Sequence, residues 1–116
     1  MDLTEYQRLA QRTANPKLSN WEKIMNGCLG MCGESGECID LIKKAEFQEH
    51  PFDRDKLLEE IGDVMWYVAE TASGLGYTLN EVCKHNLKKL SLRYPEGFDA
   101  QNSIHRPEYE EGNNDE

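Results

Sequence analysis

The chain has 116 residues, with 22 acidic and 13 basic side chains, a formal net charge of −9 and 38% hydrophobic residues. A chain of this length forms one domain, whose core buries only about two thirds of the surface exposed by the unfolded chain. The acidity argues against a nucleic-acid polymer as partner, because basic side chains drive that binding, and no apolar run approaches the ~20 residues of a membrane helix.

The first five residues, Met1 to Glu5, are acidic where a signal peptide is basic and then apolar, so we expect a cytoplasmic protein. A small anionic ligand remains compatible with the net charge if cations bridge it to the chain. The four cysteines form no Cys-x-x-Cys pair. We expect them to be small thiols packed between helices, with a zinc site as the less favoured alternative.

The turn residues separate four predicted helices. The first follows Asp2 or Thr4 and continues to about residue 14, and the second begins after Ser19 or Asn20 and continues to Phe47. Glycines at positions 27, 30, 33 and 36 lower the helix propensity of the second segment. A kink, or the close approach of another backbone or a ligand, would account for them.

The third predicted helix begins near Asp53 and ends around residues 73 and 74. The fourth begins after Thr78, with Glu81 completing a capping-box pattern, and ends before Pro95. No run alternates with period two for long enough to predict a strand. We therefore predict an all-α, four-helix-type bundle over residues 1–98. Residues 99–116 form a polar, acidic tail that is either disordered or an arm that orders on a partner subunit.

Two pairs of carboxylates carry the strongest chemical signal. Glu34 and Glu37 lie three residues apart on the second helix, as do Glu60 and Asp63 on the third, and this spacing puts both members of a pair on one helix face. Like charges repel at this spacing, whereas a hard divalent cation makes the arrangement favourable. Oxygen-only ligation favours Mg²⁺ or Mn²⁺ over zinc or iron. The alternative is an ordinary solvated acidic face.

The apolar residues around these pairs sharpen the prediction. Glu60 borders the apolar stripe of the third helix, where an unpaired charge is costly. Trp66 points away from that stripe, so a second surface must cover it, most simply another subunit. The second helix has one apolar stripe apart from its glutamates, formed by Trp21, Ile24, Cys28, Cys32, Ile39 and Ile42.

Two other carboxylate-based metal sites are excluded by spacing. A diiron bundle needs a Glu-x-x-His pair, and none of the three histidines has a glutamate three residues before it. An EF-hand loop beginning at Asp53 would need glycine and glutamate where the chain has Leu58 and Val64.

The fourth helix adds a basic edge made of Asn86, Lys89 and Arg93. The two cations could bind phosphate oxygens, or they could simply complement the helix dipole near its end. Lys56 lies one turn before Glu60, where an ordinary i, i+4 ion pair is an equally good interpretation.

The residues resemble the MazG-like nucleotide pyrophosphohydrolases of the all-α NTP pyrophosphatase superfamily. The resemblance covers about residues 21–98 and rests on the runs GMCGESGE (30–37), LEEIGDVMWY (58–67), NLKKL (86–90) and RYPEGF (93–98). It implies Mg²⁺-dependent hydrolysis of nucleoside triphosphates between the α and β phosphates, giving a monophosphate and pyrophosphate in nucleotide-pool housekeeping. Mn²⁺ could replace Mg²⁺.

The resemblance also implies the roles of individual residues. The metal ligands would be Glu34, Glu37, Glu60 and Asp63. Glu37, Lys56 and Glu60 would be catalytic, with Glu37 as the candidate acceptor of the water's proton. The substrate-binding residues would be Asn86, Lys89, Arg93 and Trp21, where Trp21, like Trp66, is a candidate for base stacking.

Relatives of this family form dimers or tetramers that complete the bundle across subunits, so we expect a homo-oligomer. Two alternative functions stay open. One is hydrolysis of a related nucleotide or phosphoribosyl diphosphate substrate, and the other, less favoured, is a non-catalytic helical adaptor. The adaptor role predicts substitutions at the metal positions, yet all four carboxylates are present.

Overall fold

The computed structural model describes residues 1–110, which form helices and contain no β-strand. The predicted all-α class is therefore confirmed for this part of the chain. The helices are α1 (Leu3–Gln11), α2 (Asn20–Phe47), α3 (Arg54–Leu75), α4 (Leu79–Arg93), α5 (Ala100–His105) and α6 (Pro107–Glu110).

The chain divides into two compact units, Met1–Leu79 and Asn80–Glu116. That division lies inside the domain predicted over residues 1–98, whose boundary stays a prediction. Along residues 1–110, no helix is both long and apolar enough to cross a bilayer.

Capping side chains explain why the predicted starts of the first three helices agree with the observed ones, whereas α1 ends at Gln11, about three residues before its predicted end, and α3 ends at Leu75, just beyond its predicted end. The Asp2 carboxylate accepts a hydrogen bond from the backbone N–H of Glu5, and Asp53 accepts one from Lys56. Ser19 and Glu22 form a complete capping box at the start of α2. At the other end of α3, Gly76 adopts a left-handed conformation, with φ of 82°, which glycine allows without a Cβ clash.

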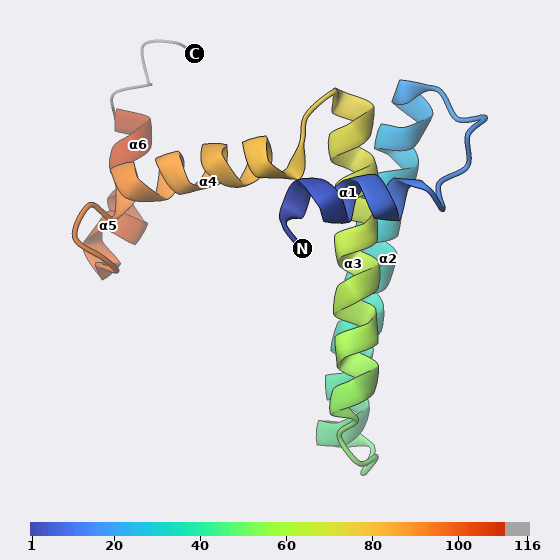
Figure 1. The fold of residues 1–116 in the computed structure, drawn as a ribbon. Helices are drawn as coiled ribbons and strands as arrows, with labels where there is room; N and C mark the ends of the chain where they lie inside the picture. Colours follow the sequence, from blue (N-terminus) through green and yellow to red (C-terminus); the bar gives the residue numbers. More distant parts are fainter. Residues whose placement is uncertain (111–116) are drawn as a thin grey trace. The chain divides into compact units, whose positions relative to one another are not determined.

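Helices α2 and α3 lie side by side as a long hairpin (Figure 1). A Cβ atom on Gly27 would clash with the Thr71 hydroxyl, and one on Gly30 would clash with the ring of Tyr67. Gly33 and Gly36 have open space beside them. The close approach of another helix, one of the predicted explanations, thus accounts for two of the four glycines.

The packing of Gly30 against Tyr67 predicts how a substitution at Gly30 changes stability. Gly30→Ala is expected to destabilise the protein by about 1–3 kcal/mol, because the Tyr67 ring must move out of its position. The matched control Gly33→Ala meets no neighbour and should be neutral or stabilising by up to about 1 kcal/mol. Urea unfolding at one protein concentration measures both. Equal effects of the two substitutions would contradict the packing of Gly30 against Tyr67.

Helix α1 packs on α3 within the first unit. Its Gln7 side chain donates to Ser73 Oγ (2.9 Å) and to the Tyr77 carbonyl (3.1 Å), and accepts from the backbone N–H of Leu79 (2.7 Å). These bonds tie α1 to the end of α3 and the start of α4. The adjacent small core consists of Ala69, Ala72 and Leu79, with Tyr6, Met65 and Val68 packed against it.

Helix α1 also corrects the expectation that another subunit covers Trp66. The indole Nε1 of Trp66 donates to the Ala10 carbonyl (3.2 Å) and to Thr13 Oγ1 (2.8 Å). The covering surface is therefore the N-terminal helix of the same chain. The sequence pattern of α3 showed that a cover was needed, but not which segment supplied it.

Apart from Ile24, which lies beside Gly74 of α3, most of the apolar stripe predicted on α2 is turned away from α3. Helix α2 packs on α3 through the face that carries Gly27 and Gly30, because the missing side chains let the backbones approach. Most of the predicted stripe is consequently exposed in the single chain, with Ile39 61% and Trp21 64% exposed. We call its exposed members, Trp21, Cys28, Cys32, Ile39 and Ile42, the α2 stripe.

The second unit contains most of α4 followed by α5 and α6. Asp99 caps α5 by accepting from the N–H groups of Gln101 and Asn102. After α5, Arg106 has a left-handed conformation with φ of 49°, and the chain folds back so that Glu108 binds Arg93. The predicted tail is therefore helical from residue 100 to 110, apart from Arg106 between the two helices, and contacts its own chain. Residues 111–116 of that tail lie outside the described residues.

Candidate active site

Three of the four predicted ligand carboxylates converge between α2 and α3. Glu34 comes from α2, and Glu60 and Asp63 come from successive turns of α3, with one oxygen of each within 4.8 Å of the others. Glu60 is 7% exposed, Glu34 is partly buried and Asp63 is exposed. The expectation that Glu60 borders the core is confirmed.

The electrostatics of this carboxylate cluster (Glu34, Glu60 and Asp63) favour a bound cation. The pKa of Glu34 is raised, chiefly by its hydrogen bond with Glu60, then by burial and by the charges of Asp63, Glu60 and Glu37. Without a cation, a proton held between Glu34 and Glu60 relieves part of this repulsion. A hard divalent ion would relieve it more fully, and carboxylate oxygens are the ligands that Mg²⁺ and Mn²⁺ prefer. The donor set fits such an ion.

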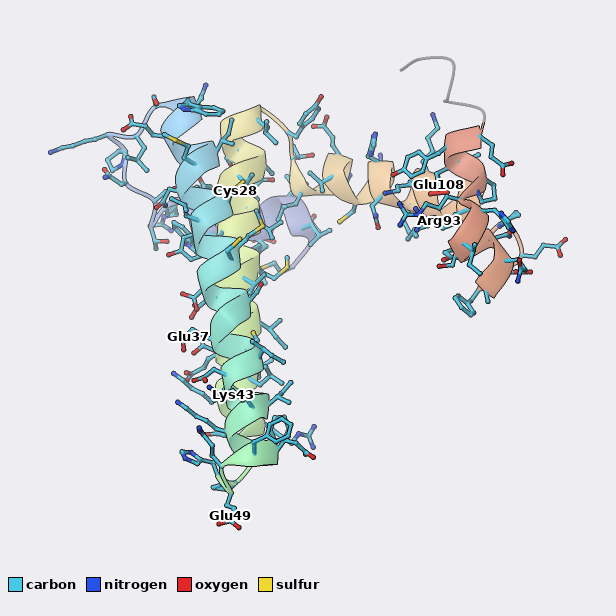
Figure 2. All side chains as sticks on the ribbon, turned by 180° about the vertical axis from the view of Figure 1, so that it is seen from behind. Cys28, Glu37, Lys43, Glu49, Arg93 and Glu108 are labelled. Carbon is cyan, nitrogen blue, oxygen red and sulfur yellow. The ribbon has the colours of Figure 1, made fainter. Side chains whose placement is uncertain are left out.

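Glu37, the fourth predicted ligand, lies on the exposed surface of α2 (Figure 2). It is not a member of the carboxylate cluster. Three residues of α-helix rotate a side chain by about 300°, so Glu37 is displaced by about 60° around the helix from Glu34. Its charge still raises the pKa of Glu34. The assignments of Glu37 as ligand and proton acceptor stay predictions.

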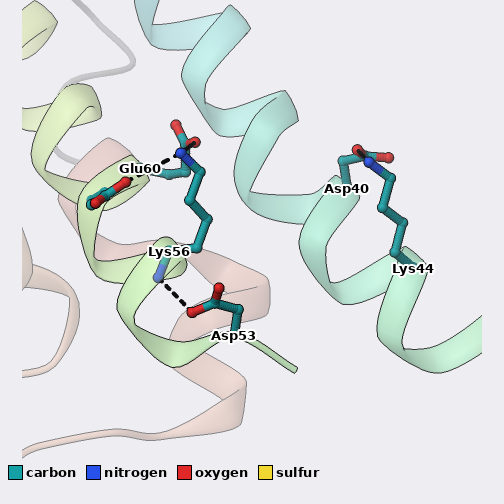
Figure 3. Close-up of polar contacts among 6 residues, drawn as sticks. Asp40, Lys44, Asp53, Lys56 and Glu60 are labelled. Carbon is teal, nitrogen blue, oxygen red and sulfur yellow. Dashed lines mark hydrogen bonds and ion pairs between the residues drawn. The ribbon is translucent and has the colours of Figure 1, made fainter. Parts of the chain in front are cut away.

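Lys56 lies beside the carboxylate cluster (Figure 3). Its Nζ is 3.1 Å from Glu59 Oε2 and 3.6 Å from Glu60 Oε1, and its pKa is raised, first by the hydrogen bond with Glu59 and then by the charges of Glu59 and Glu60. The i, i+4 ion pair with Glu60 is therefore present. Lys56 therefore lies at the edge of the carboxylate cluster. Its catalytic role stays a prediction.

A pocket of about 320 Å³ opens next to the carboxylates and is lined by Glu34, Asp63, Trp66 and Tyr67. Tyr6 of α1 lies near the same region. Its pKa is raised, first by burial and then by the charge of Asp63. Tyr67 lies four residues after Asp63 on α3, a spacing that brings the two side chains to one face of the helix. Sequence reasoning missed Tyr6, because no local pattern shows that α1 packs beside Asp63, 57 positions later in the chain.

The four predicted substrate-binding residues are not members of the carboxylate cluster. One lies on α2, far along the helix from Glu34, and three lie on α4. Trp21 is 13 residues before Glu34 on the same helix, which is about 20 Å along its axis. Asn86, Lys89 and Arg93 belong to α4 in the second unit. There Arg93 pairs with Glu108, and Lys89 lies over the ring of Tyr109, two partners that sequence reasoning did not anticipate.

Comparison with known proteins found a matching family model and a similar protein. Residues 26–98 match the model of the MazG nucleotide pyrophosphohydrolase domain. The chain is also similar to the Gene 37 protein of Mycobacterium phage L5, with 40% identity over 73 residues, covering 60% of this chain and 64% of that protein. No solved structure matches the chain. The matched region contains the whole carboxylate cluster together with Glu37, Lys56, Asn86, Lys89 and Arg93, and it leaves out α1 and α6.

Proposed function

Because the chain belongs to the MazG nucleotide pyrophosphohydrolase family, we propose that it hydrolyses nucleoside triphosphates between the α and β phosphates in nucleotide-pool housekeeping. The observation that carries the proposal is the convergence of Glu34, Glu60 and Asp63 beside an open pocket. An adaptor has no use for three converging carboxylates, one of them buried, whose mutual repulsion a cation or a proton relieves.

The carboxylates would hold Mg²⁺, with Mn²⁺ as a substitute, and Glu37 would join them as the fourth ligand. When bound, the ion would neutralise phosphate charge and make water more acidic. The buried Glu60 is fixed in direction by its helix and by Lys56, which favours a preorganised site over a flexible acidic surface.

The reaction then needs a proton acceptor and cations for the leaving group. A water oxygen forms a bond to the α phosphorus, the bond from that phosphorus to the bridging oxygen of the β phosphate breaks, and pyrophosphate leaves. Glu37 is the proposed acceptor of the water's proton. Lys56, Lys89 and Arg93 would stabilise charge on the phosphate oxygens, and Asn86 would bind the sugar or a phosphate. Trp21 is the candidate for contact with the base.

A product assay tests the proposed function. The purified protein is incubated with Mg²⁺ and each canonical ribonucleoside and deoxyribonucleoside triphosphate, and the products are separated by chromatography. A nucleoside monophosphate with equimolar pyrophosphate is the expected result. Inorganic phosphate with a diphosphate would place cleavage at a different bond, and no turnover of any triphosphate with Mg²⁺ or Mn²⁺ would contradict the proposal. Turnover only of another nucleotide or of a phosphoribosyl diphosphate would favour the alternative substrate class.

We further propose that the working protein is a homodimer or homotetramer. Support comes from the α2 stripe, which is apolar and exposed in the single chain, with Ile42 46% exposed in addition to Ile39 and Trp21. Within the described residues, the fully buried apolar side chains are only Ala69, Ala72 and Leu79. A second subunit packed against the α2 stripe would supply the missing core.

The raised pKa of Glu34 predicts a pH-dependent response to Mg²⁺. Because the pKa of the Glu34 carboxyl is raised in the folded protein, ionising this carboxyl at high pH lowers the stability of the metal-free protein. As the pH falls through the raised pKa, the carboxyl takes up a proton. The cation must displace this proton. Mg²⁺ should therefore raise the melting temperature more at about pH 7.5 than at about pH 5, with stabilisation of about 2.7 kcal/mol at a hundredfold excess over Kd. Differential scanning fluorimetry measures the shift, with NaCl of matched ionic strength as control. Equal shifts at both pH values would contradict proton competition at the carboxylate cluster.

A further inference from the structure

The ion pair between Arg93 and Glu108 joins the end of α4 to α6 (Figure 2). Nη2 of Arg93 lies 2.5 Å from Glu108 Oε2, while Nε donates to Oε2 at 2.6 Å and to Oε1 at 3.0 Å. The two side chains are only 16% and 3% exposed. Solvent screens such a pair much less than an exposed surface pair, so the contact restricts the Arg93 side chain.

The geometry leaves part of the guanidinium available. A guanidinium has five N–H donors in a planar fork, and Glu108 accepts from the edge formed by Nε and Nη2. The opposite edge, with the Nη1 donors and the second Nη2 hydrogen, is not used by this carboxylate. Tyr94 also lies against the guanidinium, with its ring centre 5.9 Å from Cζ, and the pKa of Arg93 is raised first by the hydrogen bond with Glu108 and also by one with Tyr94. The opposite edge has the fork shape that binds two phosphate oxygens together.

The surroundings of the pair keep a net positive charge. Lys89 lies one turn before Arg93, and its Nζ is 5.5 Å from the centre of the Tyr109 ring. Two cations and one carboxylate leave a charge of +1 among these three side chains. The consecutive residues Glu108 and Tyr109 thus contact both cations, while Glu108 neutralises only one of the two positive charges.

We propose that Glu108 is a positioning residue, which holds the guanidinium of Arg93 by one edge so that the other edge binds phosphate oxygens of the nucleotide. This inference rests on the proposed function. It goes beyond the family match, because α6 lies outside the matched residues 26–98. Glu108 acts here through Arg93 and does not touch the substrate.

The test compares Glu108→Gln with Glu110→Gln, a matched control that removes one acid from the exposed end of the same helix. The probe is inorganic pyrophosphate with Mg²⁺, whose Kd is measured by calorimetry. Glu108→Gln should raise this Kd roughly tenfold, as expected for a charge-assisted hydrogen bond that is no longer oriented, whereas Glu110→Gln should not change it. For whichever nucleotide the product assay identifies, KM should rise more than kcat falls.

A lower Kd in Glu108→Gln would show that the carboxylate competes with phosphate, and an unchanged Kd would show that the pair does not serve binding. Either result overturns the proposal.

Two further measurements separate positioning from a purely structural role. In an Arg93→Ala background, Glu108→Gln should have no additional effect on the Kd, because Glu108 acts only through Arg93; additive losses would overturn the proposal. The Nε–H resonance of Arg93 in a ¹⁵N spectrum should be protected from exchange in the wild type and lose that protection in Glu108→Gln. If Glu108→Gln unfolds α6, Glu108→Asp retains the charge and should recover part of the affinity; no recovery in a folded Glu108→Asp protein would overturn the proposal.

The outcomes also separate this inference from the proposed function. If no triphosphate is hydrolysed by the wild type, the proposed function fails, while the pyrophosphate titration still reports whether Arg93 binds phosphate. If the wild type is active and Glu108→Gln leaves both the Kd and KM unchanged, only the positioning role of Glu108 fails.

Discussion

Replacing Asp63 by asparagine is expected to lower the rate of triphosphate hydrolysis by about 10²-fold or more, the scale seen when a group that stabilises the transition state is removed. Asp63 contributes one of the three converging carboxylates and lines the adjacent pocket. Asparagine keeps the shape of the side chain but loses the charge that balances a divalent cation. We predict a loss of the same size for Glu37→Gln, which tests the assignment of Glu37 as fourth ligand and proton acceptor.

The fold should survive these substitutions. Removing one charge from the carboxylate cluster weakens the repulsion that raises the pKa of Glu34, so the metal-free Asp63→Asn protein should be at least as stable as the wild type. Its far-ultraviolet circular dichroism should be unchanged, and Mg²⁺ should no longer raise its melting temperature.

The matched control is Glu46→Gln, which neutralises an exposed acid near the end of α2. Product formation by chromatography measures all three variants under identical conditions. Full activity of Asp63→Asn would remove the carboxylate cluster from the mechanism, and full activity of Glu37→Gln would remove Glu37 alone. A rate loss in Glu46→Gln as large as in Asp63→Asn would show that overall charge, rather than the site, controls the rate.

Local patterns were sufficient for the first four helices, α1 to α4, and for half of the site, but not for α5 and α6 in the predicted tail. Ser19, Asp53 and Gly76 define helix ends through bonds and conformations confined to a few residues, so the sequence alone locates those ends. The pairing of Glu60 with Asp63 follows in the same way from three residues of helix. The meeting of Glu34 with that pair required two helices to pack, and there the family resemblance supplied what spacing alone did not.

Contacts between distant segments account for the predictions that failed. The cover over Trp66 comes from α1, more than 50 residues away in the sequence, and no periodicity within α3 identifies it. The sequence did not show which face of α2 packs on α3, because the choice depends on the close approach that Gly27 and Gly30 allow to Thr71 and Tyr67. Glu108 was treated only as part of an acidic tail, since its pairing with Arg93 depends on the turn at Arg106.

Because the α2 stripe is apolar and exposed in the single chain, a charge placed on it should weaken association between subunits. Ile39 is 61% exposed in the single chain and lies toward the C-terminal end of the α2 stripe. If a second subunit covers the α2 stripe, Ile39→Glu would bury a charge without a partner. An interface with twofold symmetry contains this change twice. At about 2 kcal/mol per subunit, the loss is about 4 kcal/mol, or roughly a thousandfold in the Kd for association.

Sedimentation velocity over a range of protein concentrations measures the association, with Ile39→Val as the matched control that keeps an apolar side chain. The wild type and Ile39→Val should sediment as a dimer or tetramer, and Ile39→Glu should sediment mainly as the 13.4 kDa monomer. Glutamate is a good helix former, so a loss of association cannot be attributed to a broken α2. A wild-type protein that is monomeric at all concentrations would contradict the proposed homo-oligomer. An Ile39→Glu protein that still associates like the wild type would show that the subunits meet through another surface.

Because Glu34 and Glu37 lie on α2 between Cys32 and Ile39, a subunit packed on the α2 stripe would also restrict the motion of this helix segment. We therefore expect the monomeric variant to lose hydrolytic activity together with its association.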